Sequence, residues 1–266
     1  MKAVILAGGF AKRLRKEVLL AQTVPKPLLP LNGTPIIEYI LKKIEPIHIE
    51  SLYILTSLKW KDNFEKWLES FHYCKKITLS VLPFKDEAED PGAVGGLGWF
   101  IQKERIKDDL FIIAGDNLFN GFDVERFVDY QKQKNAPVIA CYDIKDREKA
   151  KNYGVVLLMG KKGEITCEGH GEIVCFSEKP GYPRSTLIST ACYVYPAHVL
   201  DLITTYLCNK HNPTDAPGHF VQWLCNQEPT YGFVFDGAWF DIGSKESYEK
   251  AEEYVKQSQK FKNVNP

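Results

Sequence analysis

In the first half of the chain, short apolar runs alternate with segments whose apolar residues recur at helical spacing, and this alternation constrains the fold more than any other feature. The apolar runs predict buried strands at residues 2–7, 52–56, 77–82 and 110–114. The helical spacing predicts helices at 36–44, 62–70 and after Gly98, with Thr34 as N-cap and Pro35 as the first residue of the earliest one. Strands that alternate with helices are typical of βαβ units, so we expect a mostly parallel sheet flanked by helices.

From Pro137 onward, strand patterns dominate the chain. They predict strands at residues 138–142, 154–158, 173–177, 188–195 and 232–235, interrupted by helices near 197–207 and 220–226. Residues 244–260 predict an amphipathic helix that is capped by Ser244 and followed by a polar tail. No linker rich in Gly, Pro or Ser and no internal repeat divides the chain, so we expect one continuous α/β domain, residues 1–266, on a mixed sheet.

Charge and hydropathy exclude several classes of protein. The 34 basic and 34 acidic residues cancel, so the net charge gives no reason to expect a nucleic-acid partner. No apolar run approaches the roughly 18 residues of a membrane helix, and the first apolar stretch meets Lys12 and Arg13 where a signal peptide would offer a cleavage site. The seven cysteines are odd in number and form no C-x-x-C pair, which argues against disulfides and zinc. We expect a cytoplasmic protein without a membrane partner.

Residues 6–14, with the sequence LAGGFAKRL, form the strongest local pattern. A buried strand runs into Gly8 and Gly9 and then into Lys12 and Arg13. Glycines let backbone N–H groups approach a ligand, and an Arg side chain can bind a phosphate through two hydrogen bonds, so this turn is a candidate polyphosphate site. It lacks the Ser or Thr of a Walker A loop and the third glycine of the dinucleotide fingerprint. The alternative is a tight turn followed by a solvated cationic face.

Two further patterns place a fixed cation and an acid. Pro25 and Pro27 flank Lys26 and stiffen the backbone around it, which suits a point charge that grips a phosphate; the alternative is a stiff surface loop. Asp116 and Asn117 follow the apolar run 110–114 directly. Ligands bind at the carboxyl ends of strands in open α/β sheets, so Asp116 is expected to face a substrate.

A carboxylate that faces polyphosphate requires a cation between them, and Mg²⁺ commonly binds one or two carboxylates plus phosphate oxygens. A second acid is therefore expected, and the best candidate is Asp241 in the segment WFDIG, residues 239–243. An acid among aromatic and aliphatic residues is costly to bury unless it meets a cation or a donor. The alternative is an ordinary turn or N-cap aspartate ahead of the last helix.

Three weaker patterns agree with this interpretation. Residues 91–98 are rich in glycine and would let a nucleobase or ribose lie on bare backbone, although they could also be a flexible loop. Glu178 and Lys179 place an acceptor and a cation side by side after a strand, as a sugar phosphate would require. Tyr153 and Gly154 are further candidates for this sugar-phosphate pocket; the alternative is that they only begin a strand.

Taken together, these segments resemble the sugar-phosphate nucleotidyltransferases, also called nucleotide-sugar pyrophosphorylases. The family patterns L-A-G-G-x-G-T-R-L, P-K-P-L-L-P, G-T-A-G-A-L, G-D-N, E-K-P and W-x-D-x-G match, in this order, residues 6–14, 25–30, 92–97, 115–117, 178–180 and 239–243. The resemblance spans most of the chain, and the segment GDNLF at 115–119 looks most like glucose-1-phosphate thymidylyltransferases.

The resemblance implies a Rossmann-like GT-A fold and the reaction of a sugar 1-phosphate with a nucleoside triphosphate to an NDP-sugar and pyrophosphate. It divides the domain into a nucleotide-binding half, 1–135, a sugar-phosphate-binding half, 136–243, and a C-terminal helix and tail, 244–266. Arg13, Lys26, Asp116 and Asp241 would be catalytic, and the two aspartates would ligate Mg²⁺. The remaining implied contacts are those to the nucleotide, from Leu6, Ala7, Gly8, Gly9, Lys12, Gly92 and Ala93, and those to the sugar phosphate, from Tyr153, Gly154, Glu178 and Lys179.

The chain departs from the family pattern at several positions. Ala11 and Lys12 replace the usual Gly-Thr, and an alanine restricts the backbone if φ at Ala11 is positive. The loop between Arg13 and Lys26 is longer than usual. Residues 188–193 replace a pattern in which Asn and Gly face the sugar. These changes concern how the triphosphate is bound and which sugar is accepted. No hexapeptide repeats follow, so we expect no appended acyltransferase domain.

The reaction class agrees with the residue types. A sugar phosphate has a second pKa near about 6, so its oxygen is already an anion at neutral pH and needs no general base. The best substrate prediction is glucose 1-phosphate with dTTP or UTP, in a protein that could self-associate as a homo-oligomer. One alternative is a non-catalytic sugar-nucleotide-binding regulatory subunit, against which the retained acids and Lys26 argue. A glycosyltransferase of the same fold would usually show D-x-D, whereas Asp116 is followed by Asn117 and Leu118.

Overall fold

One ten-stranded sheet organises the molecule. The computed structural model describes residues 1–160, 163–166 and 169–264, apart from the side chains of Lys12 and of residues 259–264. Within these ranges, the strands of the sheet lie in the order β10-β9-β11-β13-β8-β12-β6-β1-β4-β5. Their bounds in chain order are β1 Lys2–Leu6, β4 Ser51–Ser57, β5 Ile77–Leu82, β6 Leu110–Ala114, β8 Val138–Asp143, β9 Gly154–Met159, β10 Ile165–Thr166, β11 His170–Glu178, β12 Leu187–Tyr195 and β13 Tyr231–Val234.

The two halves of the sheet differ in strand direction. The strands β5, β4, β1 and β6 run parallel to one another, as the alternation of strands and helices predicts. Beyond β6, the pairs β6–β12, β12–β8, β11–β13, β11–β9 and β9–β10 are antiparallel, and only β8–β13 is parallel among the described neighbours there. The predicted mixed α/β sheet of Rossmann-like type is therefore confirmed, with its parallel part in the first half.

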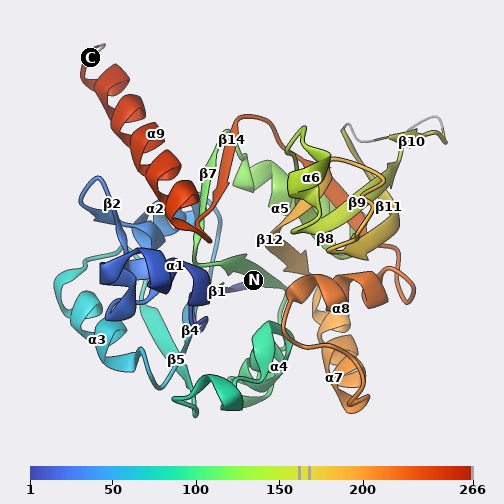
Figure 1. The fold of residues 1–266 in the computed structure, drawn as a ribbon. Helices are drawn as coiled ribbons and strands as arrows, with labels where there is room; N and C mark the ends of the chain where they lie inside the picture. Colours follow the sequence, from blue (N-terminus) through green and yellow to red (C-terminus); the bar gives the residue numbers. More distant parts are fainter. Residues whose placement is uncertain (161–162, 167–168, 265–266) are drawn as a thin grey trace.

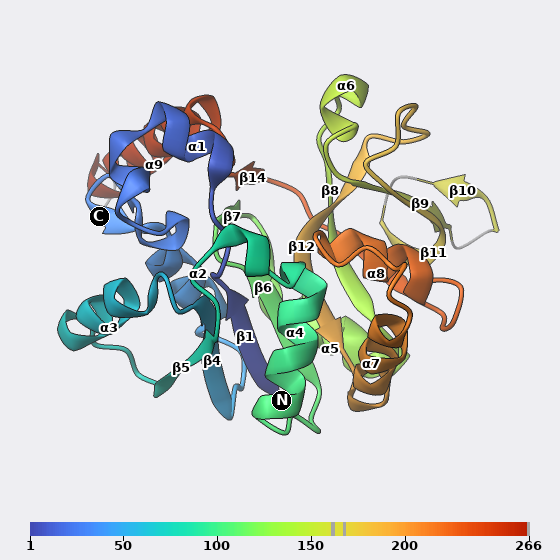
Figure 2. The ribbon, with the colours of Figure 1, turned by 60° about the horizontal axis from the view of Figure 1, so that its bottom comes forward.

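Helices cover both faces of the sheet because strand residues alternate between two cores. On β1, Ala3 and Ile5 pack into the core with α2 (Ile36–Ile44), α3 (Lys61–Ser70), α5 (Val124–Lys134) and α9 (Lys245–Val264). Val4 packs into the opposite core with α4 (Gly92–Lys103), α7 (Leu200–Cys208) and α8 (Pro217–Leu224). Figures 1 and 2 show α3 and α4 on opposite sides of β4 and β1. This period of two is the expected pattern for a sheet buried on both sides.

One predicted local structure is wrong, and one segment with two open interpretations is a helix. Thr34 does not cap a helix: it pairs as part of β3 (Thr34–Pro35) with β2 (Pro30–Leu31), and Pro35 occupies the N-cap position of α2 without a capping side chain. The glycine-rich segment, for which a flexible loop was one alternative, is the first half of α4, so the helix expected after Gly98 begins at Gly92. In that helix, Gly96 and Gly98 leave the space that Leu82 and Leu207 fill, so tertiary packing overrides the low helix propensity of glycine.

Several elements have no counterpart in the sequence predictions. They include α1 (Lys12–Glu17), α5, α6 (Arg147–Ala150), the strand pair β7 (Asn117–Asn120) and β14 (Ala238–Asp241), and the short 3₁₀ helices at 19–22, 26–28 and 87–89. The predicted C-terminal helix is present, and Ser244 caps it by accepting a hydrogen bond from the Ser247 N–H at 3.2 Å. The division of the domain at residues 135 and 243 stays a prediction.

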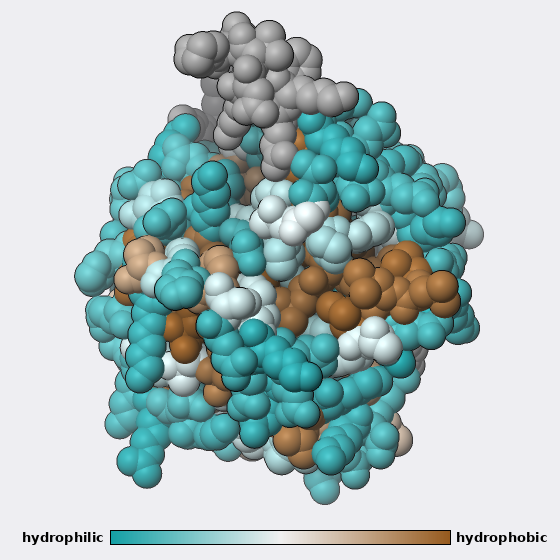
Figure 3. Space-filling view, turned by 90° about the vertical axis from the view of Figure 1, so that its left-hand side faces the viewer, coloured by the Kyte–Doolittle hydropathy of each residue, from teal (hydrophilic) through white to brown (hydrophobic). Residues whose placement is uncertain are grey.

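The face on which α3 lies is mainly polar and carries an apolar strip (Figure 3). Figure 3 looks at the side where α3 lies and shows hydrophobic residues surrounded by polar ones. Among large hydrophobic side chains of the first sixty residues, Leu19 is 82% exposed, Leu20 44% and Leu58 38%. No helix within the described ranges is both long enough and apolar enough to cross a membrane.

Candidate functional site

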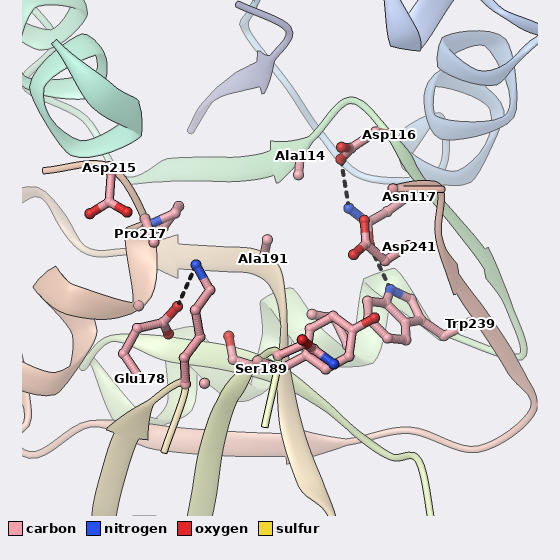
Figure 4. Close-up of a pocket in the computed structure, with 18 of the residues that line it drawn as sticks. Ala114, Asp116, Asn117, Glu178, Ser189, Ala191, Asp215, Pro217, Trp239 and Asp241 are labelled. Carbon is pink, nitrogen blue, oxygen red and sulfur yellow. Dashed lines mark hydrogen bonds and ion pairs between the residues drawn. The ribbon is translucent and has the colours of Figure 1, made fainter. Parts of the chain in front are cut away.

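A cavity of about 500 Å³ opens where the two halves of the sheet meet. Eight predicted site residues line it, namely Arg13, Lys26, Asp116, Tyr153, Gly154, Glu178, Lys179 and Asp241. They come from segments spread over most of the chain, and Figure 4 shows how the labelled ones face a common space. We call the region around Lys26, Asp116 and Asp241 the acid end, and the region around Gly154, Glu178 and Lys179 the glutamate end.

Lys26 and Asp116 form a close ion pair at the acid end. Pro25, at φ −65°, leads into a short 3₁₀ turn, Lys26–Leu28, which aims the Lys26 side chain at the end of β6. The Lys26 Nζ donates to Asp116 Oδ2 at 2.6 Å, with the two side chains 17% and 25% exposed. Burial lowers the pKa of Lys26, but the charges of Asp116 and Asp241 outweigh burial and raise it. The Lys26 side chain is therefore a permanent cation facing the cavity.

Asp241 reaches the acid end through the pairing of β7 with β14. The antiparallel register sets Asp241 opposite Asn117, and the Ile242 N–H donates to the Asp116 carbonyl at 3.0 Å. Burial and the nearby negative charge of Asp116 raise the pKa of Asp241 to about 6, although Lys26, Arg13 and a hydrogen bond from Tyr153 oppose them. Two carboxylates thus share one site, and the cations around them compensate their charge only in part.

This donor set fits a magnesium ion. Two carboxylates facing a cavity are the protein ligands that Mg²⁺ usually takes, with its other positions left to water and phosphate. Burial first, and the charge of Asp116 second, raise the pKa of Asp241, and a divalent cation between the two carboxylates would oppose both effects. Among the described residues, no group of three or more His, Cys, Asp and Glu side chains could hold a metal ion, so no all-protein cage competes with this pair.

At the glutamate end, the Glu178 side chain is only 6% exposed and lies 3.6 Å from the Lys179 ammonium. Burial raises the pKa of Glu178, and Lys179 and His219 oppose this shift. A Cβ added at Gly218 would overlap Glu178 Oε2, whereas one added at Gly154 would meet the Phe176 ring before it meets Glu178 Oε2 at 2.9 Å. Backbone approach from the start of β9 and from the first turn of α8 therefore fixes this acid.

The segment 215–218 was not predicted as part of the site. Asp215, Ala216, Pro217 and Gly218 all line the cavity, and Figure 4 shows Asp215 and Pro217 across from Glu178. The available signal was Pro217, which stands at the first position of α8, where proline is favoured. Helix starts often bind ligands, but a single proline gives no indication of which cavity the helix faces.

Left-handed backbone conformations gather around the cavity. Ala11, Lys179 and Ala191 have φ values of 51°, 45° and 53°, and all three line it. Ala191 lies within an irregularity in the β12–β8 register between Ser189 and Tyr193. The φ of Ala11 is therefore positive, the condition under which alanine restricts the backbone there. Alanine in this conformation costs roughly 1 kcal/mol relative to glycine.

The predicted nucleotide contacts lie outside the cavity lining. Gly9 is exposed with open space at its α-carbon, while Gly8 faces Thr56 and Ser57 at the end of β4. Leu6 and Ala7 pair with the neighbouring strands. A Cβ added at Gly92 would meet the Thr214 backbone, so this glycine does not offer the open backbone expected for a base or ribose. The Lys12 side chain lies outside the described part. The roles of all seven residues stay predictions.

Comparison with known proteins decides the family. The model of the nucleotidyl transferase family matches residues 2–258. The chain belongs to this family. One relative is the bifunctional protein GlmU of Methanocaldococcus jannaschii, 28% identical over 96% of this chain and 54% of its own length. Another is the UTP–glucose-1-phosphate uridylyltransferase AglF of Haloferax volcanii, 25% identical over 97% of both chains.

The fold of this nucleotidyl transferase chain also agrees with solved structures. A UDP-glucose pyrophosphorylase complexed with UDP-glucose superposes with a TM-score of 0.78 at 18% identity, over 97% of this chain and 98% of the other. The chain spans about half the length of the first curated relatives it matches, 51–61% for the top three. Fold and family are thereby fixed, and the predicted resemblance is confirmed.

Proposed function

We propose that the protein transfers a nucleotidyl group from a nucleoside triphosphate to a sugar 1-phosphate. The observation that carries the proposal is the pairing, in one cavity, of the acid end with the glutamate end, each holding a lysine beside a carboxylate. Two anionic substrates could each meet a cation there while the acids hold Mg²⁺. Membership of the nucleotidyl transferase family supports this assignment.

In the proposed reaction, a phosphate oxygen of the sugar 1-phosphate attacks the α-phosphorus of the triphosphate. A new P–O bond forms, the bond to the β-phosphate oxygen breaks, and pyrophosphate leaves with the electron pair of that bond. No proton has to be removed, because the attacking oxygen is ionised at neutral pH. This explains why the cavity needs no histidine base.

The side chains of the acid end would bring two mutually repelling anions together. Lys26 would bind the phosphates that react, and Arg13 would bind the triphosphate through its guanidinium. Asp116 and Asp241 would hold Mg²⁺, which supplies Lewis-acid stabilisation of the charge on the phosphoryl group. Lys179 would bind the phosphate of the sugar, and the buried Glu178 would accept hydrogen bonds from sugar hydroxyls.

The substrates we propose are glucose 1-phosphate with UTP or dTTP. The full-length match to the uridylyltransferase of H. volcanii supports a pyrimidine nucleotide and a glucose phosphate.

Self-association as a homo-oligomer is also proposed. Light scattering tests it, and the exposed Leu19 and Leu20 are the first side chains to replace in that test.

The deciding experiment is a matrix of the four nucleoside triphosphates and dTTP against several sugar 1-phosphates, scored by pyrophosphate release with Mg²⁺ and with EDTA. We expect release from a pyrimidine triphosphate and glucose 1-phosphate, only with the metal. The Asp116→Asn variant is the negative control. Binding of a nucleotide sugar by calorimetry without pyrophosphate release from any pair would instead favour the regulatory-subunit alternative.

A further inference from the structure

Asn117 joins two distant parts of the acid end. Its Nδ2 donates to Asp116 Oδ1 at 3.1 Å, and its Oδ1 accepts from the Trp239 indole Nε1 at 2.7 Å, across 122 positions of sequence. Figure 4 shows both interactions as a continuous line from Asp116 through Asn117 to Trp239. Asn117 is only 3% exposed, so water does not compete for these hydrogen bonds.

The chemistry of the three groups requires this arrangement. An indole N–H can only donate and an ionised carboxylate can only accept, so the residue between them must offer one acceptor and one donor. An amide meets this condition in a single orientation, with its oxygen toward Trp239 and its nitrogen toward Asp116. An aspartate at 117 could not donate to Asp116, and an aliphatic residue could serve neither neighbour.

The carboxylate of Asp116 is held on both oxygens as a result. Asn117 binds Oδ1, and Lys26 binds Oδ2. We propose that Asn117 and Trp239 are positioning residues, which fix the orientation of the Asp116 carboxylate so that its remaining lone pairs face Asp241 and the cavity. This inference rests on the proposed function, because a fixed orientation of the Asp116 carboxylate matters when that carboxylate binds a cation.

The ring of Trp239 has a second, separable contact. It packs edge-on against Tyr153 at 5.4 Å between ring centroids, and Tyr153 hydrogen-bonds to Asp241. Trp239→Phe therefore removes the indole N–H while keeping an aromatic ring, and Asn117→Leu removes both the acceptor and the donor of the side-chain amide with the same number of heavy atoms. Trp223→Phe is the matched control, because Trp223 packs against Phe220 and Tyr206, away from the cavity.

The first readout is the indole N–H signal of Trp239 in a nitrogen-15 NMR spectrum of the full chain, assigned by its loss in Trp239→Phe. We expect this signal to move in Asn117→Leu and, by a smaller amount, in Asp116→Asn, because the hydrogen bonds polarise one another. A signal that stays in place in Asn117→Leu would overturn the proposal. This measurement needs neither a metal nor turnover.

The second readout is the affinity for Mn²⁺ alone, measured by electron paramagnetic resonance. We expect binding to weaken about tenfold in Asn117→Leu and about threefold in Trp239→Phe. In the double variant, the loss should equal that of Asn117→Leu alone, since Trp239 acts through Asn117. A purely structural role of Trp239 would instead give the same threefold loss in both backgrounds. That result, or unchanged affinity in both single variants, would contradict the proposal.

The two hypotheses fail in different ways. If the wild type turns over sugar 1-phosphates but Asn117→Leu leaves the Trp239 signal and the Mn²⁺ affinity unchanged, the positioning role is wrong and the proposed function stands. If both readouts respond as expected but no substrate pair yields pyrophosphate, the proposed function is wrong and the positioning role stands.

Discussion

The acid end and the glutamate end of the cavity each hold a lysine beside a carboxylate, yet different interactions build them. At the acid end, side-chain hydrogen bonds and an ion pair fix Asp116, with Lys26 on one oxygen and Asn117 on the other. At the glutamate end, the Glu178 carboxylate lies against glycines, and Lys179 stands on a left-handed backbone with half of its side chain exposed. Polar side chains position the carboxylate at the acid end, whereas close backbone approach at glycines positions the carboxylate at the glutamate end.

This difference determines which substitutions matter at each end. At the acid end, the deletion of a charge or a donor should impair the site while the fold persists. At the glutamate end, the addition of volume should impair it, because the backbone already lies against the acid. The predictions below test this contrast in order of decreasing expected effect.

Asp116→Ala should reduce turnover by at least about a thousandfold, because it removes a proposed metal ligand and leaves Lys26 without its partner. Circular dichroism and the melting temperature should stay close to those of the wild type. A rate within tenfold of the wild type would remove Asp116 from the mechanism.

Lys26→Ala should reduce kcat about a hundredfold, which is the usual cost of losing one preorganised electrostatic contact. Lys151→Ala is the matched control, because Lys151 forms an ion pair of the same 2.6 Å length with Glu148 on the exposed surface. The control should keep the wild-type rate. Wild-type turnover in Lys26→Ala would contradict the role assigned to this lysine.

Gly218→Ala should raise KM for the sugar 1-phosphate about tenfold and lower stability by about 1–3 kcal/mol, because the added methyl group meets Glu178. Gly181→Ala adds the same methyl group where nothing lies within 4 Å and should change neither quantity. Equal effects of the two substitutions would show that volume is not what defines the glutamate end.

The pH dependence of stability should reveal the burial of Asp241 beside a second acid, Asp116. The pKa of Asp241 is raised to about 6 in the folded, metal-free protein, above that of an unfolded aspartate. Its stabilising contribution is therefore full below about pH 4 and is lost as pH rises through about 6. Asp241→Asn should gain about 1–3 kcal/mol over the wild type between pH 4 and pH 7, measured by urea unfolding with EDTA. Parallel pH profiles would contradict the shift.

Ala11→Gly and Ala191→Gly should each stabilise the protein by up to about 1 kcal/mol, because glycine removes the strain of a positive φ. Ala251→Gly, in the interior of α9, should destabilise it by about 1 kcal/mol or more. Thermal unfolding measures all three. Destabilisation of similar size in all three variants would indicate that the alanines at the cavity are not strained.

The acid end could largely be predicted from sequence, because charge and backbone stiffness are local properties. The prolines around Lys26 and the position of Asp116 after an apolar run each pointed to a cavity before any contact was known. The partners of Asp116 could not be predicted in the same way. An asparagine after an aspartate has many uses, and only the pairing of β7 with β14 shows that Asn117 meets Trp239.

The glutamate end was less accessible to sequence reasoning, since close backbone approach leaves no signal beyond a glycine. Gly154 was predicted as a cavity residue, but the need for glycine at Gly218 follows from the position of Glu178 in space. The segment 92–98 shows the same limit in reverse. Its glycines were compatible with bare backbone under a base or with a flexible loop, whereas in the structure they pack against Leu82 and Leu207 within a helix. A glycine in the sequence thus indicates that another part of the chain or a ligand packs closely against the backbone, but it does not indicate which one.

The joining of β7 to β14 has a consequence for how the protein is made. The ribosome delivers the chain from its first residue, so Asp116, Asn117 and Lys26 emerge long before Trp239 and Asp241. Until then the nascent acid end has one aspartate and lacks its second strand. Contacts of such wide separation form late and slowly during folding. A truncated translation product that ends before residue 238 should thus lack one of the two proposed metal ligands and the hydrogen-bond partner of Asn117.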